Sequence, residues 1–86
     1  MLKIEYTAKF KKDLKNIKKD NKYNINELMF VVNELANQRP LQEKYRDHAL
    51  TGNYKGHREC HIRPDWLLIY LIQSDTLTLT LSRKYK

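Results

Sequence analysis

The sequence has few of the residues that form disulfides, flexible linkers or membrane spans. A single cysteine among 86 residues excludes an internal disulfide and every multi-cysteine zinc arrangement, and it is typical of a reducing compartment. Two glycines and two prolines are too few for long flexible linkers. No apolar run approaches the roughly 18–20 residues of a membrane span, and the N-terminus lacks the basic-then-apolar pattern of a signal peptide. We therefore expect one soluble, cytoplasmic domain over residues 1–86.

Acidic residues are also in the minority. Ten Asp and Glu stand against seventeen Lys and Arg, which gives a net charge of +7 at pH 7. On so small a domain this charge produces a positive field that favours nucleic acid, an acidic protein or an anionic membrane as the partner. Apolar residues make up 41% of the chain, enough to build a packed core. Composition thus indicates a folded basic protein without choosing among these partners.

Helical periodicity dominates the N-terminal half, after a weakly alternating stretch at Leu2–Glu5 that predicts a short edge strand. A helix is predicted to begin near Thr7, because apolar residues recur there at the spacing of one helix face. These residues are Tyr6, Phe10, Leu14 and Ile17. Lysines fill most of the other positions, and we interpret that face as solvated in preference to an RNA or membrane contact.

A second helix follows a turn at Asp20–Asn24. Asn24 and Glu27 have the spacing of a capping box, in which each side chain bonds the backbone N–H of the other residue. The apolar face of this helix comprises Ile25, Leu28, Met29, Val32, Leu35 and Ala36. Pro40 predicts that the helix ends near Gln38, so the two helices form an antiparallel hairpin.

The C-terminal half alternates with period two, the pattern of strands. Residues 42–55 are polar and mixed, and they predict a loop. The expected strands are His57–Arg63, Trp66–Ile72 and Leu77–Leu81, with turns at Pro64-Asp65 and Ser74-Asp75. The apolar run of the second strand suits a central position that is buried on both faces. Short connections imply an antiparallel sheet covered on one face by the helical hairpin, so the predicted fold is α+β in the order β-α-α-β-β-β.

Metal binding and thiol catalysis are both disfavoured by the residues. His57 and His61 are four apart, and on a strand that spacing separates them by about 13 Å, too far for two ligands of one ion. Cys60 shares the apolar face with Ile62, where a thiol acts as a small buried hydrophobe rather than as a nucleophile. We therefore expect neither a metal nor a cofactor.

Metal-free RNA cleavage is the chemistry that these residue types can support. It needs a base for the ribose 2′-hydroxyl proton, an acid for the departing 5′-oxygen and cations around the phosphate. Histidine, whose unperturbed pKa is about 6.5, suits both proton roles. The candidate groups are His48, His61 and Asp65, with Lys44, Arg46, Lys55, Arg58 and Arg83 as cations for RNA binding. The plainer alternative is a set of surface histidines beside a basic loop.

Two adjoining stretches resemble a known family. Residues 45–56 read Y-R-D-H-A-L-T-G-N-Y-K-G, and residues 57–70 continue as H-R-E-C-H-I-R-P-D-W-L-L-I-Y. The elements D-H-x-L-x-G, R-x-x-H and P-D-x-x-L-x-Y are similar, in order and spacing, to those of YafQ-type mRNA interferase toxins of the RelE/ParE superfamily, which belong to type II toxin–antitoxin systems. The predicted order of helices and strands agrees with the RelE-like fold over nearly all of the chain.

This resemblance implies metal-independent, ribosome-dependent cleavage of translated mRNA and neutralisation by a cognate antitoxin. It implies catalytic positions at His48, His61 and Asp65, with Arg83 facing the scissile phosphate. Either His48 or Asp65 would be the base, and His61 would bind or protonate the phosphate. Trp66 stands where it could stack on a base or pack in the core.

The resemblance breaks at the C-terminus. Family members close with a segment like R-T-G-S-H-x-x-L-F, whose histidine takes part in cleavage, whereas here Arg83 is followed only by Lys84, Tyr85 and Lys86. Tyr85 could act as a catalytic group instead, because related toxins use a tyrosine near this end. A phenol, with an ordinary pKa near 10, is a poor substitute. We therefore expect weakened activity from an atypical or truncated end.

Three classes of function follow from these patterns. The leading one is the endoribonuclease toxin, and the second is a catalytically inactive module that still binds antitoxin and ribosome or RNA. A sequence-specific DNA-binding protein is the weakest, because no helix-turn-helix pattern places a recognition helix. The expected partners are the antitoxin, the ribosome and mRNA, with no membrane, and with DNA contacted only through the antitoxin.

Overall fold

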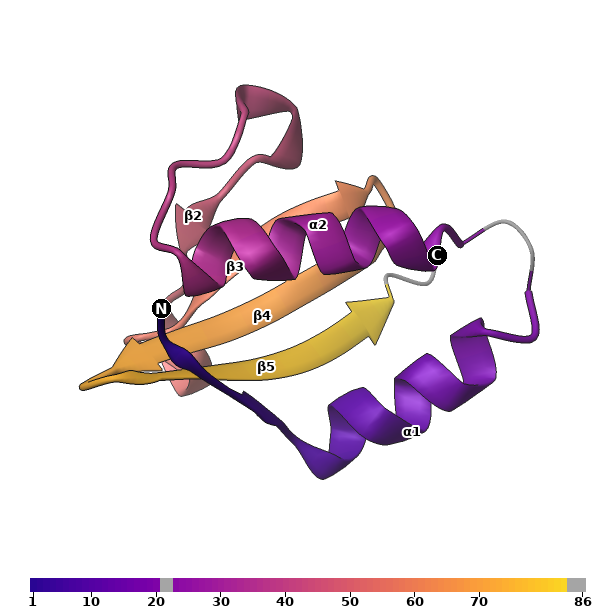
Figure 1. Ribbon diagram of the computed structural model, residues 1–86, viewed down its shortest axis with the longest axis horizontal. Helices are drawn as coiled ribbons and strands as arrows, with labels where there is room; N and C mark the ends of the chain where they lie inside the picture. The colour runs from indigo at the N-terminus through magenta and orange to yellow at the C-terminus, as the bar shows by residue number, and fades with distance from the viewer. Residues whose placement is uncertain (21–22, 84–86) are drawn as a thin grey trace.

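The chain folds into one mixed sheet with two helices against one of its faces (Figure 1). The computed structural model describes residues 1–20 and 23–83, the last of these by its backbone alone. The elements in chain order are β1 (Lys3–Tyr6), α1 (Ala8–Ile17), α2 (Ile25–Ala36), the 3₁₀ turn η1 (Glu43–Tyr45), β2 (His48–Ala49), the 3₁₀ turn η2 (Gly52–Tyr54), β3 (Arg58–Arg63), β4 (Trp66–Gln73) and β5 (Thr76–Arg83). The strands lie side by side in the order β1-β5-β4-β3-β2.

Both helices begin at side chains that cap unpaired backbone N–H groups. The Thr7 hydroxyl accepts a hydrogen bond from the Phe10 N–H at 3.1 Å. The Asn24 side chain accepts from the N–H groups of Asn26 and Glu27 at 2.9 and 3.3 Å. These bonds satisfy donors that the first turn of a helix leaves without an intrahelical partner. The predicted starts of α1 and α2 are confirmed.

Only half of the predicted capping box is present. Asn24 caps α2, but Glu27 does not bond back to the Asn24 N–H within the described residues. The Glu27 carboxylate instead meets the Tyr45 hydroxyl at 3.4 Å and the Arg63 Nε at 3.2 Å. Glu27 therefore ties the start of α2 to η1 and to the end of β3. The predicted turn that precedes α2 contains residues 21 and 22, which lie outside the described residues.

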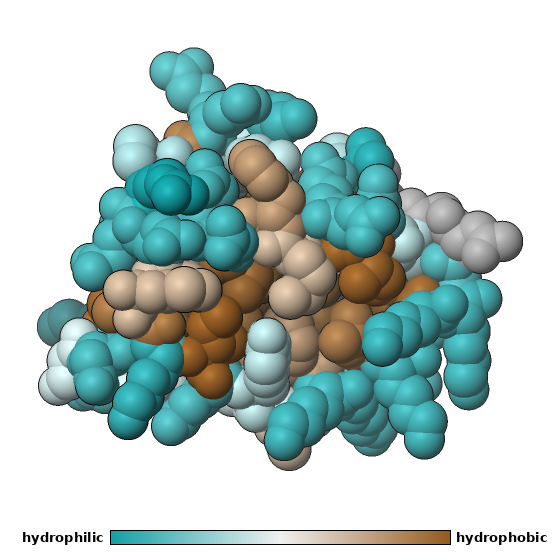
Figure 2. All heavy atoms as spheres, viewed as in Figure 1, coloured by the Kyte–Doolittle hydropathy of each residue, from teal (hydrophilic) through white to brown (hydrophobic). Residues whose placement is uncertain are grey.

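The core lies between the helices and one face of the sheet. α1 packs mainly against β5, and α2 packs against β3. The largest fully buried side chains include Phe10, Ile17, Leu28, Trp66, Leu68, Leu77, Leu79 and Leu81. From the helix side, apolar side chains fill the space between α1 and α2, and hydrophilic ones surround them (Figure 2). Within the described ranges, no helix is long and apolar enough to cross a bilayer.

The central strand is β4, as its apolar run predicts. It pairs with β3 on one side and with β5 on the other, both antiparallel. Every side chain from Trp66 to Tyr70 is buried, on whichever face of the sheet it lies. The predicted antiparallel arrangement of β3, β4 and β5 is confirmed, with turns where Pro64-Asp65 and Ser74-Asp75 predict them.

Two features of the sheet differ from the prediction. The sheet is mixed, because β1 pairs parallel with β5, from Lys3 beside Thr76 to Tyr6 beside Leu79. A short connection forces antiparallel pairing only on consecutive strands, and β1 and β5 are joined through both helices. The loop predicted over residues 42–55 also contains strand β2, which pairs antiparallel with β3. Two polar-flanked residues carry no periodicity from which such a strand could be predicted.

Candidate active site

The face of the sheet opposite the helices presents three side chains that can exchange protons. His48 of β2 stands directly opposite Glu59 of β3. His61 lies two residues beyond Glu59 on the same strand, so all three side chains project from one face. Cys60 and Ile62 alternate with them and point into the core. These three residues form what we call the His48–Glu59–His61 cluster. Pairing across the strands joins His48 to Glu59, and the alternation along β3 joins Glu59 to His61.

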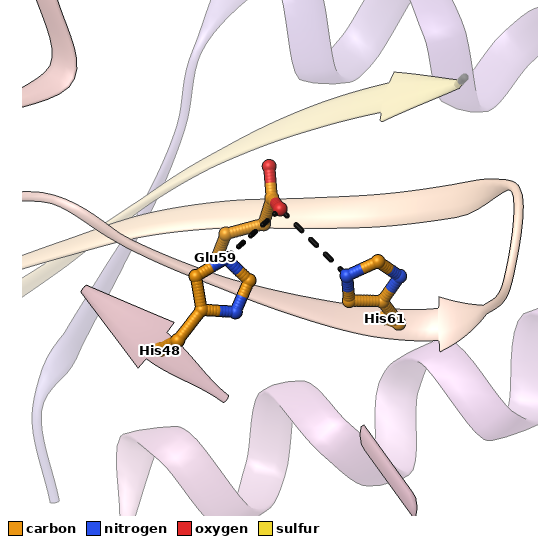
Figure 3. Close-up of side chains that lie close together, drawn as sticks. All are labelled: His48, Glu59 and His61. Carbon is orange, nitrogen blue, oxygen red and sulfur yellow. Dashed lines mark ion pairs between the residues drawn. The ribbon is translucent and has the colours of Figure 1, made fainter. Parts of the chain in front are cut away.

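The Glu59 carboxylate lies between the two imidazole rings (Figure 3). Its Oε1 atom is 3.3 Å from His48 Nε2 and 3.8 Å from His61 Nε2. The ring centroids of the two histidines are 5.9 Å apart. The His48 side chain is 47% exposed, whereas those of Glu59 and His61 are each 15% exposed. The cluster therefore has one solvent-facing imidazole and one sheltered imidazole that share a carboxylate.

The backbone before β2 fixes which nitrogen of His48 faces the cluster. His48 Nδ1 lies 2.7 Å from the Arg46 carbonyl oxygen, which can only accept. Nδ1 therefore carries a proton and donates it, and Nε2 is the nitrogen directed toward Glu59. Arg46 itself adopts a left-handed conformation with φ of 49°. That turn aims its carbonyl at the imidazole and so holds the ring in place.

A hydrogen-bonded tether anchors the residue before His48 to the sheet. The Asp47 carboxylate accepts from the Tyr70 hydroxyl at 2.6 Å and from the Arg58 Nε at 3.1 Å. Burial, followed by the hydrogen bond to Asp47, raises the pKa of Tyr70, so the phenol stays protonated and remains a donor. Tyr70 and Arg58 are directly paired on β4 and β3. The position of His48 thus depends on Tyr70 and Arg58, which belong to the face of the sheet that the helices cover.

The His48–Glu59–His61 cluster also has the composition of a metal site. Its ligand atoms all lie within 4.8 Å of one another, and imidazole and carboxylate are common ligands of transition metals. The spacing of His57 and His61, which disfavours a metal, says nothing about His48. His48 approaches His61 only because β2 pairs with β3. The cluster can therefore hold protons or a cation, and its residue types suit both.

The predicted catalytic and cationic residues divide by location. Asp65 is exposed in the turn between β3 and β4, outside the cluster. Lys44 and Arg46 line a pocket that His61 also lines. Lys55 is exposed in the loop after η2. Arg58 points to the face opposite the histidines, where Asp47 pairs with it. Among the predicted cations whose side chains are described, Lys44 and Arg46 are the two that lie beside the cluster.

The prediction that Trp66 could stack on a base is wrong. Its indole is fully buried, and it meets the Tyr23 ring edge-on with centroids 5.1 Å apart. No ring face is left for a nucleobase, and the core-packing alternative holds. Arg83 ends β5 beside Trp66, but its side chain lies outside the described residues, as does Tyr85. Their predicted roles at the phosphate stay predictions.

Cys60 is an inert core residue. Its side chain is fully buried, and burial raises the pKa of the thiol to about 12, with smaller contributions from the charges of Asp47 and Glu59. A thiol in this state is neither a nucleophile nor a metal ligand at neutral pH. The interpretation of Cys60 as a buried hydrophobe is confirmed.

Glu59 is the residue of the cluster that sequence reasoning did not select. The alternation along β3 places Glu59 and His61 on one face, and this was the available signal. Its significance depends on the partner across the strand, because an isolated strand Glu is most often a solvated surface residue. The register of β2 against β3 supplies His48 as that partner.

A family model described as the YafQ bacterial toxin of type II toxin–antitoxin systems matches residues 2–84. The chain belongs to this toxin family. The YafQ mRNA interferase toxin of Escherichia coli K12 is 40% identical over 75 residues, which cover 86% of this chain and 80% of the relative. The resemblance identified from the D-H-x-L-x-G, R-x-x-H and P-D-x-x-L-x-Y elements is confirmed.

Solved structures of YafQ relatives share the fold. A metal-bound toxin from Helicobacter pylori superposes with a TM-score of 0.88 at 46% identity, covering 96% of this chain and 94% of that one. The DinJ–YafQ toxin–antitoxin complex of E. coli gives a TM-score of 0.82 at 34% identity, with 96% and 93% covered. The helix pair on one face of a five-stranded sheet is thus the family architecture.

Proposed function

We propose that this chain is a ribosome-dependent endoribonuclease that cleaves translated mRNA with the His48–Glu59–His61 cluster. The cluster is the single observation that supports this most directly, because three proton-exchanging side chains converge on the one sheet face that the helices leave open. The relatedness to a toxin named as an mRNA interferase supports the same substrate. The net charge of +7 favours an RNA ligand.

The proposed reaction moves protons between protein groups and the RNA. A base removes the 2′-hydroxyl proton, the 2′-oxygen attacks the adjacent phosphorus, and the bond from phosphorus to the 5′-oxygen breaks. A general acid then protonates the 5′-oxygen, leaving a cyclic phosphate and a 5′-hydroxyl. His48 or Asp65 serves as the base, and His61 binds or protonates the phosphate. Glu59 stabilises whichever of the two imidazoles is charged.

Cations beside the cluster supply the electrostatic part of the mechanism. Lys44 and Arg46 extend from η1 and the residue after it, next to His61. Their positive charge offsets the negative charge that builds on the phosphate as the 2′-oxygen attacks. Arg83 is proposed to act on the same phosphate, and Tyr85 to assist near it. Lys55, exposed in the loop after η2, is proposed to extend this basic surface for the RNA, whereas Arg58 lies on the other face of the sheet, paired with Asp47.

The proposed partners are a cognate antitoxin and the translating ribosome in the cytoplasm. The E. coli relative forms a complex with the antitoxin DinJ, and the basic surface of this chain suits an acidic antitoxin segment. Contact with operator DNA is proposed to require that antitoxin.

The deciding experiment is cleavage of a defined mRNA on programmed ribosomes, with the 5′ ends of the products mapped. Cuts confined to the codon in the decoding site are expected, and they should disappear when ribosomes are omitted. Intact mRNA together with retained ribosome binding would contradict the proposal and favour a module that binds without cutting.

Variants of the three histidines distinguish a role of the cluster in cleavage from an effect of the overall positive charge. His48→Gln and His61→Ala should abolish the mapped cuts and relieve growth inhibition, as should Asp65→Ala. His57→Ala is the matched control, because His57 lies outside the cluster with its ring edge-on to Tyr54. Cleavage that survives in both His48→Gln and His61→Ala would remove the cluster from the mechanism.

A further inference from the structure

Tyr54 is a large aromatic residue that stays exposed on the loop between His48 and the start of β3. Its surface is 45% exposed, and it is the last residue of the turn η2. Two backbone hydrogen bonds close the chain around it. The Lys55 N–H donates to the Gly52 carbonyl at 3.1 Å, and the His57 N–H donates to the Tyr54 carbonyl at 2.9 Å. Tyr54 is therefore held at a defined position although much of its surface meets solvent.

The pairing of β2 with β3 continues toward Tyr54. The Leu50 N–H donates to the His57 carbonyl at 2.9 Å, one step beyond the last residue pair of the two strands. His57 precedes Glu59 by two residues, a separation of about 7 Å along extended backbone. The Tyr54 ring meets the His57 ring with centroids 5.6 Å apart. Tyr54 is thus close enough to the His48–Glu59–His61 cluster for one RNA strand to contact both.

At least one face of the Tyr54 ring is free of His57. The two rings cross at 81°, so one of them presents its edge to the other. An edge of Tyr54 on His57 leaves both Tyr54 faces open, and an edge of His57 on Tyr54 covers only one of them. Within the described part of the chain, no other aromatic ring and no cation lies against Tyr54. With nearly half of the residue exposed, a flat apolar surface is left facing solvent.

An open aromatic ring beside a cation has the composition of a site for single-stranded nucleic acid. Every base has a flat face that can stack on an aromatic side chain, and cations follow the phosphate backbone. Lys55, the next residue along the chain, is exposed and supplies such a cation. Phe30 is similarly exposed, at 50%, but it lies on α2, on the side of the sheet that the cluster does not face. Position beside the cluster therefore sets Tyr54 apart.

We propose that Tyr54 is a stacking platform for an unpaired base of the mRNA strand, taken from a nucleotide that neighbours the cut. Stacking tolerates any base, so Tyr54 holds the strand in place without selecting its sequence. This inference rests on the proposed RNA cleavage for the identity of the strand.

The first test measures affinity for a short single-stranded RNA whose 2′-hydroxyls are methylated, so that it cannot be cut. Tyr54→Leu keeps an apolar side chain but loses the ring, and it should weaken binding by about tenfold, as expected for the loss of one stacked base. Tyr54→Phe keeps the ring and should bind nearly as the wild type does. Unchanged affinity in Tyr54→Leu, or an equal loss in Tyr54→Phe, would overturn the proposal.

Two variants separate stacking from exposed apolar surface and from charge. Phe30→Leu is the matched control for an exposed ring, and it should leave RNA affinity unchanged. Lys55→Gln should lower the dependence of log affinity on log salt by about 0.7, the contribution of one phosphate contact on a single strand. Tyr54→Leu should leave this salt dependence as it is. An equal loss of affinity in Phe30→Leu, or a reduced salt dependence in Tyr54→Leu, would contradict stacking.

Fluorescence detects the stacked base directly. The one native tryptophan, Trp66, is fully buried, so Tyr54→Trp introduces an exposed indole whose emission a stacked base should quench. A strand of the same length with abasic nucleotides keeps the phosphates, and it should bind without quenching. Equal quenching by both strands would overturn the platform. Failure of the wild type to cut mRNA would count against the proposed function alone, because this titration needs no cleavage.

Binding to ribosomes distinguishes mRNA from ribosomal RNA as the source of the base. Tyr54→Leu should bind ribosomes without mRNA as tightly as the wild type does. On programmed ribosomes it should raise the KM for cleavage by about tenfold, with a smaller change in kcat. Equally weakened binding to ribosomes that carry no mRNA would assign the contact to ribosomal RNA and overturn the proposal.

Discussion

Neighbouring residues of one strand serve two different purposes on the two faces of this sheet. Along β5, Leu77, Leu79 and Leu81 are fully buried beneath the helices, and the threonines between them occupy the other face. Along β3, Cys60 and Ile62 enter the same core. Glu59 and His61 point the opposite way and meet His48. We call these the covered face and the open face of the sheet.

The difference between the faces shows how a chain of 86 residues combines a core with a chemically active surface. Burial against the helices requires apolar side chains, because an unpaired charge inside would lose its hydration. The open face has no such requirement, and it can hold a carboxylate and two imidazoles within contact distance. Substitutions on the covered face should therefore act on stability, and those in the cluster should act on the reaction.

The largest effect is expected from His61→Ala on the open face. Removing a group that exchanges a proton in the reaction should lower the cleavage rate by about 10²–10⁴-fold. The free energy of unfolding, measured by urea denaturation, should change by less than about 1 kcal/mol. If the cleavage rate fell only because the variant lost much of its stability, the proposed difference between the two faces would be contradicted.

The covered face is tested by Leu79→Ala, with Thr78→Ala as its neighbour on the open face. Leu79 is fully buried, so its truncation should reduce the free energy of unfolding by about 2–5 kcal/mol. Thr78→Ala should cost less than about 1 kcal/mol. Urea denaturation of the two variants provides the measurement, and equal losses would contradict the assignment of the faces.

Tyr70→Phe tests the link between the two faces. Tyr70 belongs to the covered face, yet its hydroxyl bonds Asp47, the residue before His48. Removal of this bond to a charged acceptor should cost about 1–3 kcal/mol of stability. It should also widen the range of positions of the His48 ring, seen as altered imidazole signals by NMR. Unaltered His48 signals would mean that the contacts with Arg46 and Glu59 position the ring without help from Tyr70.

The smallest effect at neutral pH is expected from the ionisation of Cys60. Burial raises the pKa of its thiol to about 12 in the folded chain, whereas an exposed thiol ionises near 8.5. The folded state thus keeps the proton longer, so this contribution to stability is intact below about pH 8.5 and falls as the pH rises toward 12.

Cys60→Ala should therefore flatten the alkaline decline in the free energy of unfolding relative to the wild type. Denaturation at pH 7, 9 and 10.5 measures the two slopes. Parallel slopes would show that the covered face does not hold Cys60 as a neutral thiol.

Local patterns were sufficient to predict much of the fold. The caps at Thr7 and Asn24, the apolar periods of the helices and the alternation of the last three strands all depend on residues close in sequence. The parallel pairing of β1 with β5 depends on distant residues, and no local pattern expresses it. Trp66 was ambiguous for the same reason, because its burial depends on the packing of the core around it, in which Tyr23 meets its ring.

The candidate site was predictable in part. His48 and His61 were selected from their residue type and the family motifs, and the structure brings their rings to 5.9 Å between centroids. Their catalytic roles stay predictions. Glu59 was overlooked because its meaning depends on the register between β2 and β3. Glu27 was assigned to a helix cap, although its side chain turns to Arg63 and Tyr45 instead. Local sequence explains each of these glutamates as an ordinary cap or surface residue. Their partners are distant in sequence, and only the tertiary structure brings them near.

The pairing of β1 with β5 affects when the protein can fold during its synthesis. A ribosome makes β1 and α1 first, yet both pack on β5, which is made last among the described strands. Until β5 emerges, the apolar stripe of α1 has no surface to cover, and contacts so distant in sequence form slowly. Folding of the sheet therefore waits until β5 has been synthesised. A partial product of translation lacks the framework that holds His48, Glu59 and His61 together.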